Sequence, residues 1–359
     1  MEYKKLGDIA SYINGYAFKP EDRGSEGLPI IRIQDLTGNS YDLGFYNGNY
    51  PEKIEINDGD VLISWSASLG VYVWNRGKAL LNQHIFKVAF DKIDINKSYF
   101  VYAVRRKLDE MASKTHGATM KHIVKKDFNA TQIPYPSLEE QKEIAANLDR
   151  VSRIIEARKE ELDKLDDLIK ARFVEMFGMP LDKSKANMKF TDCVYFNPKK
   201  SEVKDFQDVE VSFVPMECVG VDGSFTIREN GPISSYYKGY TYFRDDDVLL
   251  AKITPCFENG KAAIAKGCKN GIGFGTTEFH VARPKKGVSN SYWIKYMLKN
   301  DSVHDLATIN MTGSAGQKRI QTPFFEKLTI FCPPIELQNQ FADFVKQVDK
   351  SKVVALKAA

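Results

Sequence analysis

The sequence predicts an α+β protein built from two similar domains, each followed by a long helix. Three observations lead to this prediction. The chain has 359 residues, too many for one ordinary core and suited to two domains of about 150 residues with a connector. The second half repeats motifs of the first in the same order, and a long amphipathic pattern separates the halves. We therefore expect domains at residues 1–136 and 180–334, with helices at 137–179 and 335–359.

Within each domain the strand patterns come first and a helical pattern comes late. Runs rich in β-branched and aromatic residues predict strands at Leu28–Ile33, Asp60–Ser64, Gly70–Trp74, His84–Phe90, Val209–Val214, Val248–Ile253 and Phe279–Ala282. Apolar residues at helical spacing predict helices at Lys97–Lys114 and Val288–Ile309. Strands grouped before helices are typical of the α+β class.

The internal repeat is the observation on which the two-domain prediction depends. Asp58–Ser64 recurs as Asp245–Ala251, in each case a turn followed by the pattern of a buried strand. The strongest match closes the two halves, where Gly117–Val151 aligns with Gly313–Val348 after a shift of one residue. The matched pairs there include Ile123 and Ile320, Phe128 and Phe325, Ile133 and Ile330, Pro136 and Pro333, Glu139 and Glu336, Gln141 and Gln338, and Ala145 and Ala342. This order of features predicts duplication of one unit.

Residues 137–179 are predicted to form one long helix. Ser137 with Glu140 three residues later has the pattern of a capping box. Gly178 and Pro180 provide the stop signal, so the helix is roughly 60 Å long at about 1.5 Å per residue. An ordinary helix packed on a globular core is the alternative, and the wide charged faces argue against it. The apolar seam, typical of a coiled coil, consists of Ile144, Leu148, Val151, Ile155, Leu162, Leu165 and Ile169.

A second and shorter helix is predicted after Pro333 and Pro334, with its apolar positions at Phe341, Val345 and Val348. We expect the two helices to pair as an antiparallel coiled coil with pseudo-twofold symmetry. The second helix has about half the length of the first, so it can cover only part of it. Either the second helix is truncated, or the exposed remainder of the first helix binds another partner.

The net charge of +4 is too small to identify a nucleic-acid binder, but the charge is unevenly distributed. Between Leu138 and Phe177 there are 8 Lys and Arg residues against 11 Asp and Glu, which leaves 43 against 36 in the rest of the chain. The two predicted domains therefore carry the positive charge, which permits contact with phosphate groups.

Composition also excludes several classes of protein. No apolar run is long enough to span a membrane and no signal peptide is recognisable, so we expect a cytoplasmic protein with no membrane partner. The five cysteines, Cys193, Cys218, Cys256, Cys268 and Cys332, never form a Cys-x-x-Cys pair. This spacing argues against a metal site and against a disulfide framework, and it fits reduced thiols.

Two copies of a motif rich in Pro, Glu and Gln carry a resemblance to a known family. The first copy is Pro134–Ala145 and the second is Pro333–Ala342. Each copy follows a segment of domain size and resembles the motif that closes a target recognition domain in specificity subunits of type I restriction-modification systems. The segments Leu6–Ile9 and Gly15–Phe18 are similar to the opening of the first domain in this family.

The resemblance implies a DNA-reading subunit with no catalysis and no cofactor of its own. Each target recognition domain would read one half of a bipartite target in double-stranded DNA, and the helices would set the spacing. In this family the helices also dock two methyltransferase subunits, which use S-adenosylmethionine to methylate adenine, and the assembly can recruit a translocating endonuclease. The second helix of this chain is shorter than the family pattern.

Base edges are read by side chains that donate or accept hydrogen bonds, so polar residues interleaved with aromatics in loops are the candidates. Arg and Lys suit guanine or phosphate, Gln suits adenine, and small hydroxyls allow close approach. The first-domain candidates are Tyr16, Lys19, Arg32, Gln34, Ser64, Trp65, Ser66, Ser68, Gln83, His84, His116, Thr119 and Lys121. The second-domain candidates are Lys199, Lys200, Glu217, Lys252, Thr254, Thr277, Glu278, Ser314, Gln317, Lys318 and Arg319.

The most suitable single segment is the polar, cationic run Gly313–Arg319, which aligns with Gly117–His122. For any one candidate, a solvated surface group is the alternative. His84 and His280 lie in strand patterns, where a structural histidine is the commoner interpretation. Trp65 could stack on a base, whereas Trp74 is interpreted as core.

Two enzyme classes are set aside. A methyltransferase needs a glycine-rich turn that leads into a helix, but Gly271–Gly275 leads into the strand pattern at Thr276–Ala282, and the Asn/Asp-Pro-Pro-aromatic motif is missing. A metal-dependent nuclease needs clustered carboxylates with a lysine, which Asp192 with residues 202–204 offers only superficially. The alternative from another class is a coiled-coil scaffold whose duplicated domains bind protein partners rather than DNA.

Overall fold

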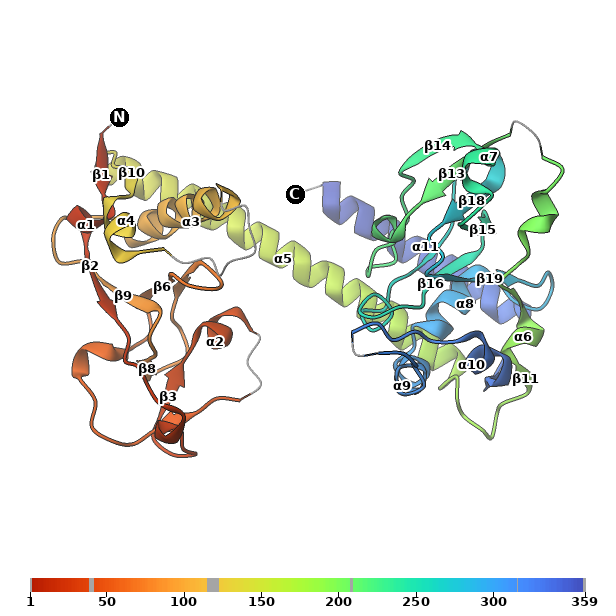
Figure 1. Ribbon diagram of the computed structural model, residues 1–359, viewed down its shortest axis with the longest axis horizontal. Coiled ribbons are helices and arrows are strands. Elements are labelled where there is room, and N and C mark those ends of the chain that lie inside the picture. The colour runs from red at the N-terminus through yellow and green to blue at the C-terminus, as the bar shows by residue number, and fades with distance from the viewer. Residues whose placement is uncertain (1, 39–41, 115–122, 207–208, 315, 358–359) are drawn as a thin grey trace. The chain divides into compact units, whose positions relative to one another are not determined.

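The computed structural model describes residues 2–38, 42–114, 123–206, 209–314 and 316–357 (Figure 1). Helices and strands occur together in both halves of the chain, which confirms the predicted mixture of α and β structure. The five cysteines are free thiols.

The chain divides into two compact units, Met1–Glu156 and Ala157–Ala359. The long helix α5 (Leu138–Phe177), traced in Figure 1 as one continuous ribbon, crosses this division. Its first half therefore belongs to the first unit and its second half to the second unit.

The strands of the first unit are β1 (Tyr3–Lys5), β2 (Ser11–Asn14), β3 (Leu28–Ile31), β4 (Phe45–Tyr46), β5 (Glu55–Ile56), β6 (Val61–Ser64), β7 (Gly70–Val73), β8 (Ala79–Leu81), β9 (Ile85–Ala89) and β10 (Gln132–Pro134). Its helices are α1 (Leu6–Ile9), α2 (Ile33–Thr37), α3 (Lys97–Lys114), α4 (Lys125–Ala130) and the first half of α5, with short 3₁₀ turns η1 (Pro20–Asp22) and η2 (Glu52–Ile54).

The strands of the second unit are β11 (Met188–Lys189), β12 (Val194–Phe196), β13 (Glu210–Val214), β14 (Glu229–Pro232), β15 (Thr241–Arg244), β16 (Val248–Ala251), β17 (Ala262–Ile264), β18 (Ile272–Gly275), β19 (Phe279–Pro284) and β20 (Thr329–Ile330). Its helices are the second half of α5, α6 (Phe190–Cys193), α7 (Ile233–Tyr236), α8 (Ser291–Leu298), α9 (Asp301–Ile309), α10 (Thr322–Lys327) and α11 (Ile335–Lys357), with 3₁₀ turns η3 (Lys200–Val203), η4 (Met216–Cys218) and η5 (Lys269–Gly271).

The two units share one sheet topology. In the first unit the strand orders are β2-β9-β6-β7, β4-β3-β8-β5 and β1-β10, and the second unit repeats them as β12-β19-β16-β17, β14-β13-β18-β15 and β11-β20. β3 pairs in parallel with β8, as β13 does with β18, whereas the other paired strands are antiparallel. Unrelated folds would not match in order, direction and connection, so the topology supports the duplication that the sequence repeat predicts.

The cores lie between the two four-stranded sheets and beneath the helices. In the first unit Phe100 of α3 and Phe128 of α4 pack in one core with Phe86 of β9. A second core lies between the two sheets and contains Trp74, which is 3% exposed. The interpretation of Trp74 as a core residue is therefore confirmed. The second unit has the same arrangement, with Trp293 of α8 in the core beneath its helices.

Several predicted elements have other bounds in the structure. The run Val288–Ile309 was expected to be one helix, but it forms α8 and α9 with a break at Lys299 and Asn300. The break occurs because the side chain of Asn300 accepts a hydrogen bond from the N–H of Ser302 and so caps a new helix. The predicted strand Leu28–Ile33 ends at Ile31, where the chain turns into α2.

The predicted start and stop of α5 are confirmed. The Glu140 carboxylate accepts from the N–H of Ser137 at 2.9 Å, and the Ser137 hydroxyl accepts from the N–H of Glu140 at 3.3 Å. These reciprocal bonds are the two halves of a capping box. At the other end Gly178 has a φ of +74°, a conformation that glycine adopts without steric cost.

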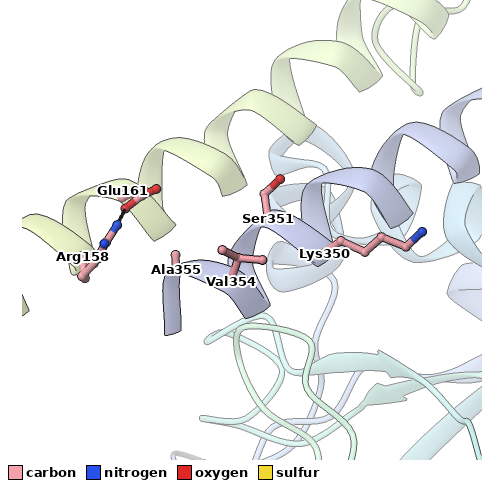
Figure 2. Close-up of a pocket in the computed structure, with 6 residues that line it drawn as sticks. All are labelled: Arg158, Glu161, Lys350, Ser351, Val354 and Ala355. Carbon is pink, nitrogen blue, oxygen red and sulfur yellow. Dashed lines mark hydrogen bonds and ion pairs between the residues drawn. The ribbon is translucent and has the colours of Figure 1, made fainter. Parts of the chain in front are cut away.

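In the second unit α5 and α11 pack side by side with opposite directions. Phe341, near the start of α11, contacts Phe173 and Phe177 near the end of α5, with ring centroids 5.4 and 5.5 Å apart. Further along α11, Lys352 pairs with Asp166 of α5. Figure 2 shows the last part of this pairing, where Val354 and Ala355 of α11 approach Arg158 and Glu161 of α5 across a cavity of about 330 Å³. The antiparallel pairing predicted for the two helices is therefore present here.

The seam residues differ in burial between the two halves of α5. Ile169 is fully buried and Leu162 and Leu165 are half-buried, and on α11 the partners Phe341, Val345 and Val348 are buried. In the first unit the seam residues are between 37 and 51% exposed, namely Ile144, Leu148, Val151 and Ile155. Apolar seam residues thus occur in both halves of α5, interrupted at Arg158 between Ile155 and Leu162, but α11 covers only the second half.

A buried glutamine joins each long helix to its domain. Gln141 accepts from the N–H of Asn96 and donates to the carbonyl of Pro136, both at 2.9 Å. Gln338 accepts from the N–H of Asn290 at 3.0 Å and donates to the carbonyl of Pro333 at 2.8 Å. Both asparagines cap the helix that follows them, α3 in the first unit and α8 in the second. The repeated glutamine of the motif therefore ties the root of the long helix to the cap of the preceding domain helix.

Candidate nucleic-acid interface

In the second unit, three segments that are distant in the sequence meet at one end of the sheet that contains β16 and β19. The backbone N–H of Lys252, just after β16, donates to the carbonyl of Glu278 at 2.9 Å. The N–H of Ile320 donates in turn to the carbonyl of Lys252, also at 2.9 Å. The segment after β16 is therefore held between the start of β19 and the end of the loop before α10.

Thr254 fixes the tip of that loop. Its N–H donates to the carbonyl of Lys318 and its hydroxyl donates to the carbonyl of Gly316, both at 3.0 Å. The N–H of Lys318 donates back to the Thr254 hydroxyl at 3.1 Å. These bonds hold residues 316–319, part of the cationic run that the sequence singled out, in a defined conformation.

An ion pair supports the side chains of this site. Arg319 donates from Nε to Oε2 of Glu278 at 3.1 Å and from Nη2 to Oε1 at 2.9 Å, and its Nη1 donates to the carbonyl of Gln317 at 3.1 Å. The hydrogen bond with Glu278 raises the pKa of Arg319. In the described part of the chain, no acidic side chain pairs with the ammonium groups of Lys252 and Lys318. The second hub, defined as Lys252, Thr254, Glu278, Lys318 and Arg319, therefore combines a fixed guanidinium with two lysines that have no acidic partner among the described residues.

The buried His280 supports the second hub through hydrogen bonds of its ring. Its Nε2 lies 2.9 Å from the carbonyl of Ile320 and its Nδ1 lies 3.2 Å from Nδ2 of Asn197. Nε2 must donate to the carbonyl and Nδ1 must accept from the amide, so the ring fits its neutral form. Burial lowers the pKa of His280 to about 4. The expectation of a structural histidine is consistent with this geometry.

The buried His280 predicts a loss of stability in acid. In the unfolded chain the imidazole has an ordinary pKa of about 6.5, so the unfolded state binds a proton first as the pH falls. The contribution is fully present above pH 6.5 and is lost as the pH falls towards 4. We expect the free energy of unfolding of the second unit to fall by about 2 kcal/mol between pH 8 and pH 5 from this residue alone. Hydrogen exchange of peptides from β19 measures this free energy. Its pH dependence should be weaker in His280→Gln, and an equal pH dependence in both proteins would contradict the assignment.

The first unit has the same backbone arrangement. The N–H of Trp65 donates to the carbonyl of His84 at 3.2 Å, and the N–H of Ile123 donates to the carbonyl of Trp65 at 3.0 Å. The N–H of Gln83 donates to the carbonyl of Tyr16 at 2.8 Å, which brings a fourth segment to the site. The first hub is defined as Tyr16, Trp65, Gln83 and His84.

Aromatic groups dominate the first hub. The ring centroids of Trp65 and His84 are 5.0 Å apart with the ring planes inclined by 65°, and Tyr16 is 45% exposed. Gly15 allows the chain to pass close to β8, because a Cβ there would lie 2.0 Å from the carbonyl oxygen of Asn82. The ring of Trp65 also stacks on Phe86 of the core, with centroids 5.5 Å apart. The exposed ring of Tyr16, which contacts Phe18, offers stacking and hydrogen bonding to a base.

Two backbone hydrogen bonds of the first hub have counterparts at matching positions of the second hub, whereas the side chains there differ. Trp65 occupies the place of Lys252, and His84 occupies the place of Glu278. A conserved backbone with different side chains is what two readers of different targets require, because base edges are distinguished by side-chain donors and acceptors.

A family model described as the type I restriction modification DNA specificity domain matches residues 1–166 and 225–358. These regions make up most of the chain. The chain belongs to this family.

Curated relatives within the specificity family match parts of the chain. The specificity subunit of the type I restriction enzyme EcoEI from Escherichia coli is 48% identical over 142 residues, which are 38% of this chain and 23% of that protein. The EcoAI specificity subunit from Escherichia coli is 45% identical over 148 residues, which are 40% of this chain and 24% of that protein. The chain thus spans about a quarter of the length of each of these relatives.

The fold of this family member also resembles a solved structure. The S subunit of the type I restriction-modification system from M. genitalium superposes with a TM-score of 0.54, over 99% of this chain and 91% of that one. At 13% sequence identity the likeness concerns the fold, and it agrees with the predicted class of two sheet-containing domains with long helices.

The structure brings together many of the residues that the sequence suggested. In the first unit, Ser64 and Ser66 stand on either side of Trp65 in the sequence. The hydroxyl of Ser64 donates to the carbonyl of Ser68, which closes a turn around Trp65. In the second unit, Thr277, Ser314 and Gln317 neighbour the hub residues along the chain.

Other candidates lie elsewhere or outside the described residues. Arg32 pairs with Asp35, next to Gln34 in α2, and Lys19 pairs with Glu21. Glu217 pairs with Arg228. Lys200 donates to the carbonyl of Tyr237, and Lys199 is exposed beside it. His116, Thr119 and Lys121 lie outside the described residues.

Sequence reasoning missed Asn197 and the joint glutamines. Asn197 has a φ of +50° and binds both His280 and the N–H of Val281, so it supports the second hub. In the sequence the two glutamines are visible only as matching positions of the repeat, with no sign of their structural role. Among the described residues, no group of three or more His, Cys, Asp or Glu side chains could hold a metal ion. No described helix is long and apolar enough to cross a membrane.

Proposed function

We propose that this chain is the DNA sequence-recognition subunit of a type I restriction-modification complex, in which each domain reads one half of a bipartite target. The observation that carries the proposal is the pair of hubs, which share a backbone framework and differ in the side chains they present. The family match and the names of the relatives support it. Residues 1–136 and 180–334 are the proposed target recognition domains, and the helices at 137–179 and 335–359 set the spacing between the half-targets.

The chain is proposed to be non-catalytic and to bind no cofactor, with S-adenosylmethionine used by the methyltransferase partner. The glycine-rich segment Gly271–Gly275 contains strand β18, and the next element is a strand rather than a helix whose N-terminus could bind a cofactor. Glu202, a carboxylate of the nuclease-like pattern, pairs with Arg283 at 2.7 Å. An endonuclease subunit is a further proposed partner. The cytoplasm is the proposed location of the complex.

The exposed half of the α5 seam is the proposed docking surface for a methyltransferase subunit. The repeat places Ile144, Leu148 and Val151 at the positions of Phe341, Val345 and Val348. The latter three are buried against the second half of α5, whereas the former are exposed. Apolar residues at coiled-coil spacing on an exposed helix face are typical of a surface that a partner helix covers.

Replacement of Val151 by glutamate tests this docking surface. Val151 is 51% exposed, so the change should alter the free energy of unfolding by no more than about 0.5 kcal/mol. It should nevertheless prevent co-purification with the methyltransferase, because a charge would be buried without a partner. The matched variant Val348→Glu changes a residue only 6% exposed and should destabilise the second unit itself. A complex that survives Val151→Glu would exclude this surface.

Salt dependence of DNA binding separates DNA recognition from the scaffold alternative. For the full chain on duplex DNA, the logarithm of the binding constant should fall linearly with the logarithm of the salt concentration, because phosphate contacts release counterions. The double variant Lys252→Ala, Lys318→Ala should make that slope shallower by roughly 1.8, which corresponds to the loss of two phosphate contacts. Two exposed lysines outside the hub, Lys238 and Lys286, provide the matched double variant. Absence of DNA binding, with a salt-insensitive protein complex instead, would favour the scaffold.

A further inference from the structure

We infer that Arg319, positioned by Glu278, reads a guanine in the half-target of the second domain. This inference rests on the proposed function, since it assumes that the second hub faces DNA. It goes further by assigning one base to one side chain.

The hydrogen bonds of Arg319 leave N–H groups available on both terminal nitrogens of its guanidinium. Nε and Nη2 donate to Glu278, and Nη1 donates to the carbonyl of Gln317. Nη1 and Nη2 carry two hydrogens each, so the contacts within the described part of the chain leave one N–H on each of these nitrogens. Two N–H groups on adjacent nitrogens are what a bidentate contact to O6 and N7 of guanine requires. The side chain is 35% exposed, so a base edge can reach it.

Glu278 favours a base over a phosphate at this position. A carboxylate that holds the guanidinium lies within a few ångströms of whatever the guanidinium binds. It would repel the negative charge of a phosphate, whereas the guanine edge carries only partial charges. The neighbouring Lys252 and Lys318 have no acidic partner among the described residues, so they are better placed to bind phosphate.

The pair is also rigid before DNA arrives. Glu278 is fixed by its backbone contact to Lys252, and the backbone of Arg319 is fixed by its bridges to Thr312 and to Ile253, which follows β16. A planar fork that is already oriented loses little side-chain freedom on binding, which increases the discrimination obtained from each hydrogen bond.

The first hub does not carry this pair. His84 stands at the place of Glu278, and the sequence repeat puts His122, which lies outside the described residues, at the place of Arg319. The guanine is therefore assigned to the half-target of the second domain only.

Selection from a pool of randomised duplexes by the full chain tests the inference. The wild-type chain should select a two-part motif with a guanine at one position of one half. In Arg319→Ala that position should become degenerate while the other half stays unchanged, and affinity for the guanine-containing duplex should fall about 10- to 100-fold. Glu278→Gln keeps the arginine but weakens its support, so it should lower the preference for guanine without lowering the affinity for unrelated DNA. Lys269→Ala, which breaks an exposed Lys–Glu pair of the same unit outside the hub, is the control and should leave the motif intact.

The outcomes distinguish the inference from the function on which it rests. If Arg319→Ala weakens binding to all duplexes equally and lowers the salt slope by about one contact, Arg319 binds phosphate and the guanine assignment is wrong. A loss of preference in both halves would also overturn it. If the wild-type chain selects no sequence, the proposed function itself fails. Thermal unfolding of each variant shows whether the fold is retained, and should Arg319→Ala unfold, Glu278→Gln still decides the question.

Discussion

The variant Arg283→Met is expected to lower the free energy of unfolding of the second unit by about 3 to 5 kcal/mol. Asp247 is 1% exposed, and both of its carboxylate oxygens accept from Arg283, each at 2.8 Å. Removal of the guanidinium leaves that carboxylate buried without its counter-charge, and this accounts for most of the cost. Hydrogen exchange of peptides from β16 and β19 in the full chain measures the effect.

Two controls make this prediction specific. The double variant Asp247→Asn, Arg283→Met should recover much of the loss, because no uncompensated charge remains buried. Arg228→Met breaks the exposed pair with Glu217 and should cost less than about 1 kcal/mol. A loss below 1 kcal/mol in Arg283→Met would show that the buried pair does not hold β16 against β19.

The second large effect is expected for the joint between the domain and its long helix. Gln338→Ala removes the acceptor of the Asn290 N–H. It also removes the amide that donates to the carbonyl of Val288 at 2.9 Å and to the carbonyl of Pro333. Several buried polar groups then lose their partners, so the free energy of unfolding of the second unit should fall by about 3 kcal/mol. Exchange should accelerate most at the start of α11 and of α8.

An exposed glutamine on the same helix provides the comparison for this prediction. Gln340→Ala changes a residue two positions further along α11 that faces solvent, and should be within about 0.5 kcal/mol of the wild type. Equal effects at Gln338 and Gln340 would mean that the motif glutamine is not a structural joint.

Much of the architecture could be predicted from the sequence because it depends on local patterns. The helix Lys97–Lys114 was predicted with the bounds that α3 has, and Ser137 with Glu140 marked the start of α5. The split of Val288–Ile309 was missed because apolar spacing continues through it, although Asn300 is a preferred helix cap. The local signal was present, and the longer periodicity concealed it.

The hubs could be predicted only in part, because they depend on tertiary contacts. Residues near Gly313–Arg319 were recognisable from composition, but nothing local shows that Glu278, 41 positions earlier, binds Arg319. In the same way Lys200 has the chemistry of a phosphate ligand, and only the fold shows that it donates to Tyr237 instead. Sequence gives the residue types that can read DNA, and the pairing of strands decides which of them converge.

Genome-wide mapping of methylated adenines tests the central claim most directly. The chain is co-expressed with its proposed methyltransferase partner, first as the wild type and then with residues 1–136 exchanged for the first domain of another family member. We predict a two-part methylated motif for the wild type, of which only one part changes after the exchange. A continuous short motif, or a change in both parts, would contradict independent reading by two domains.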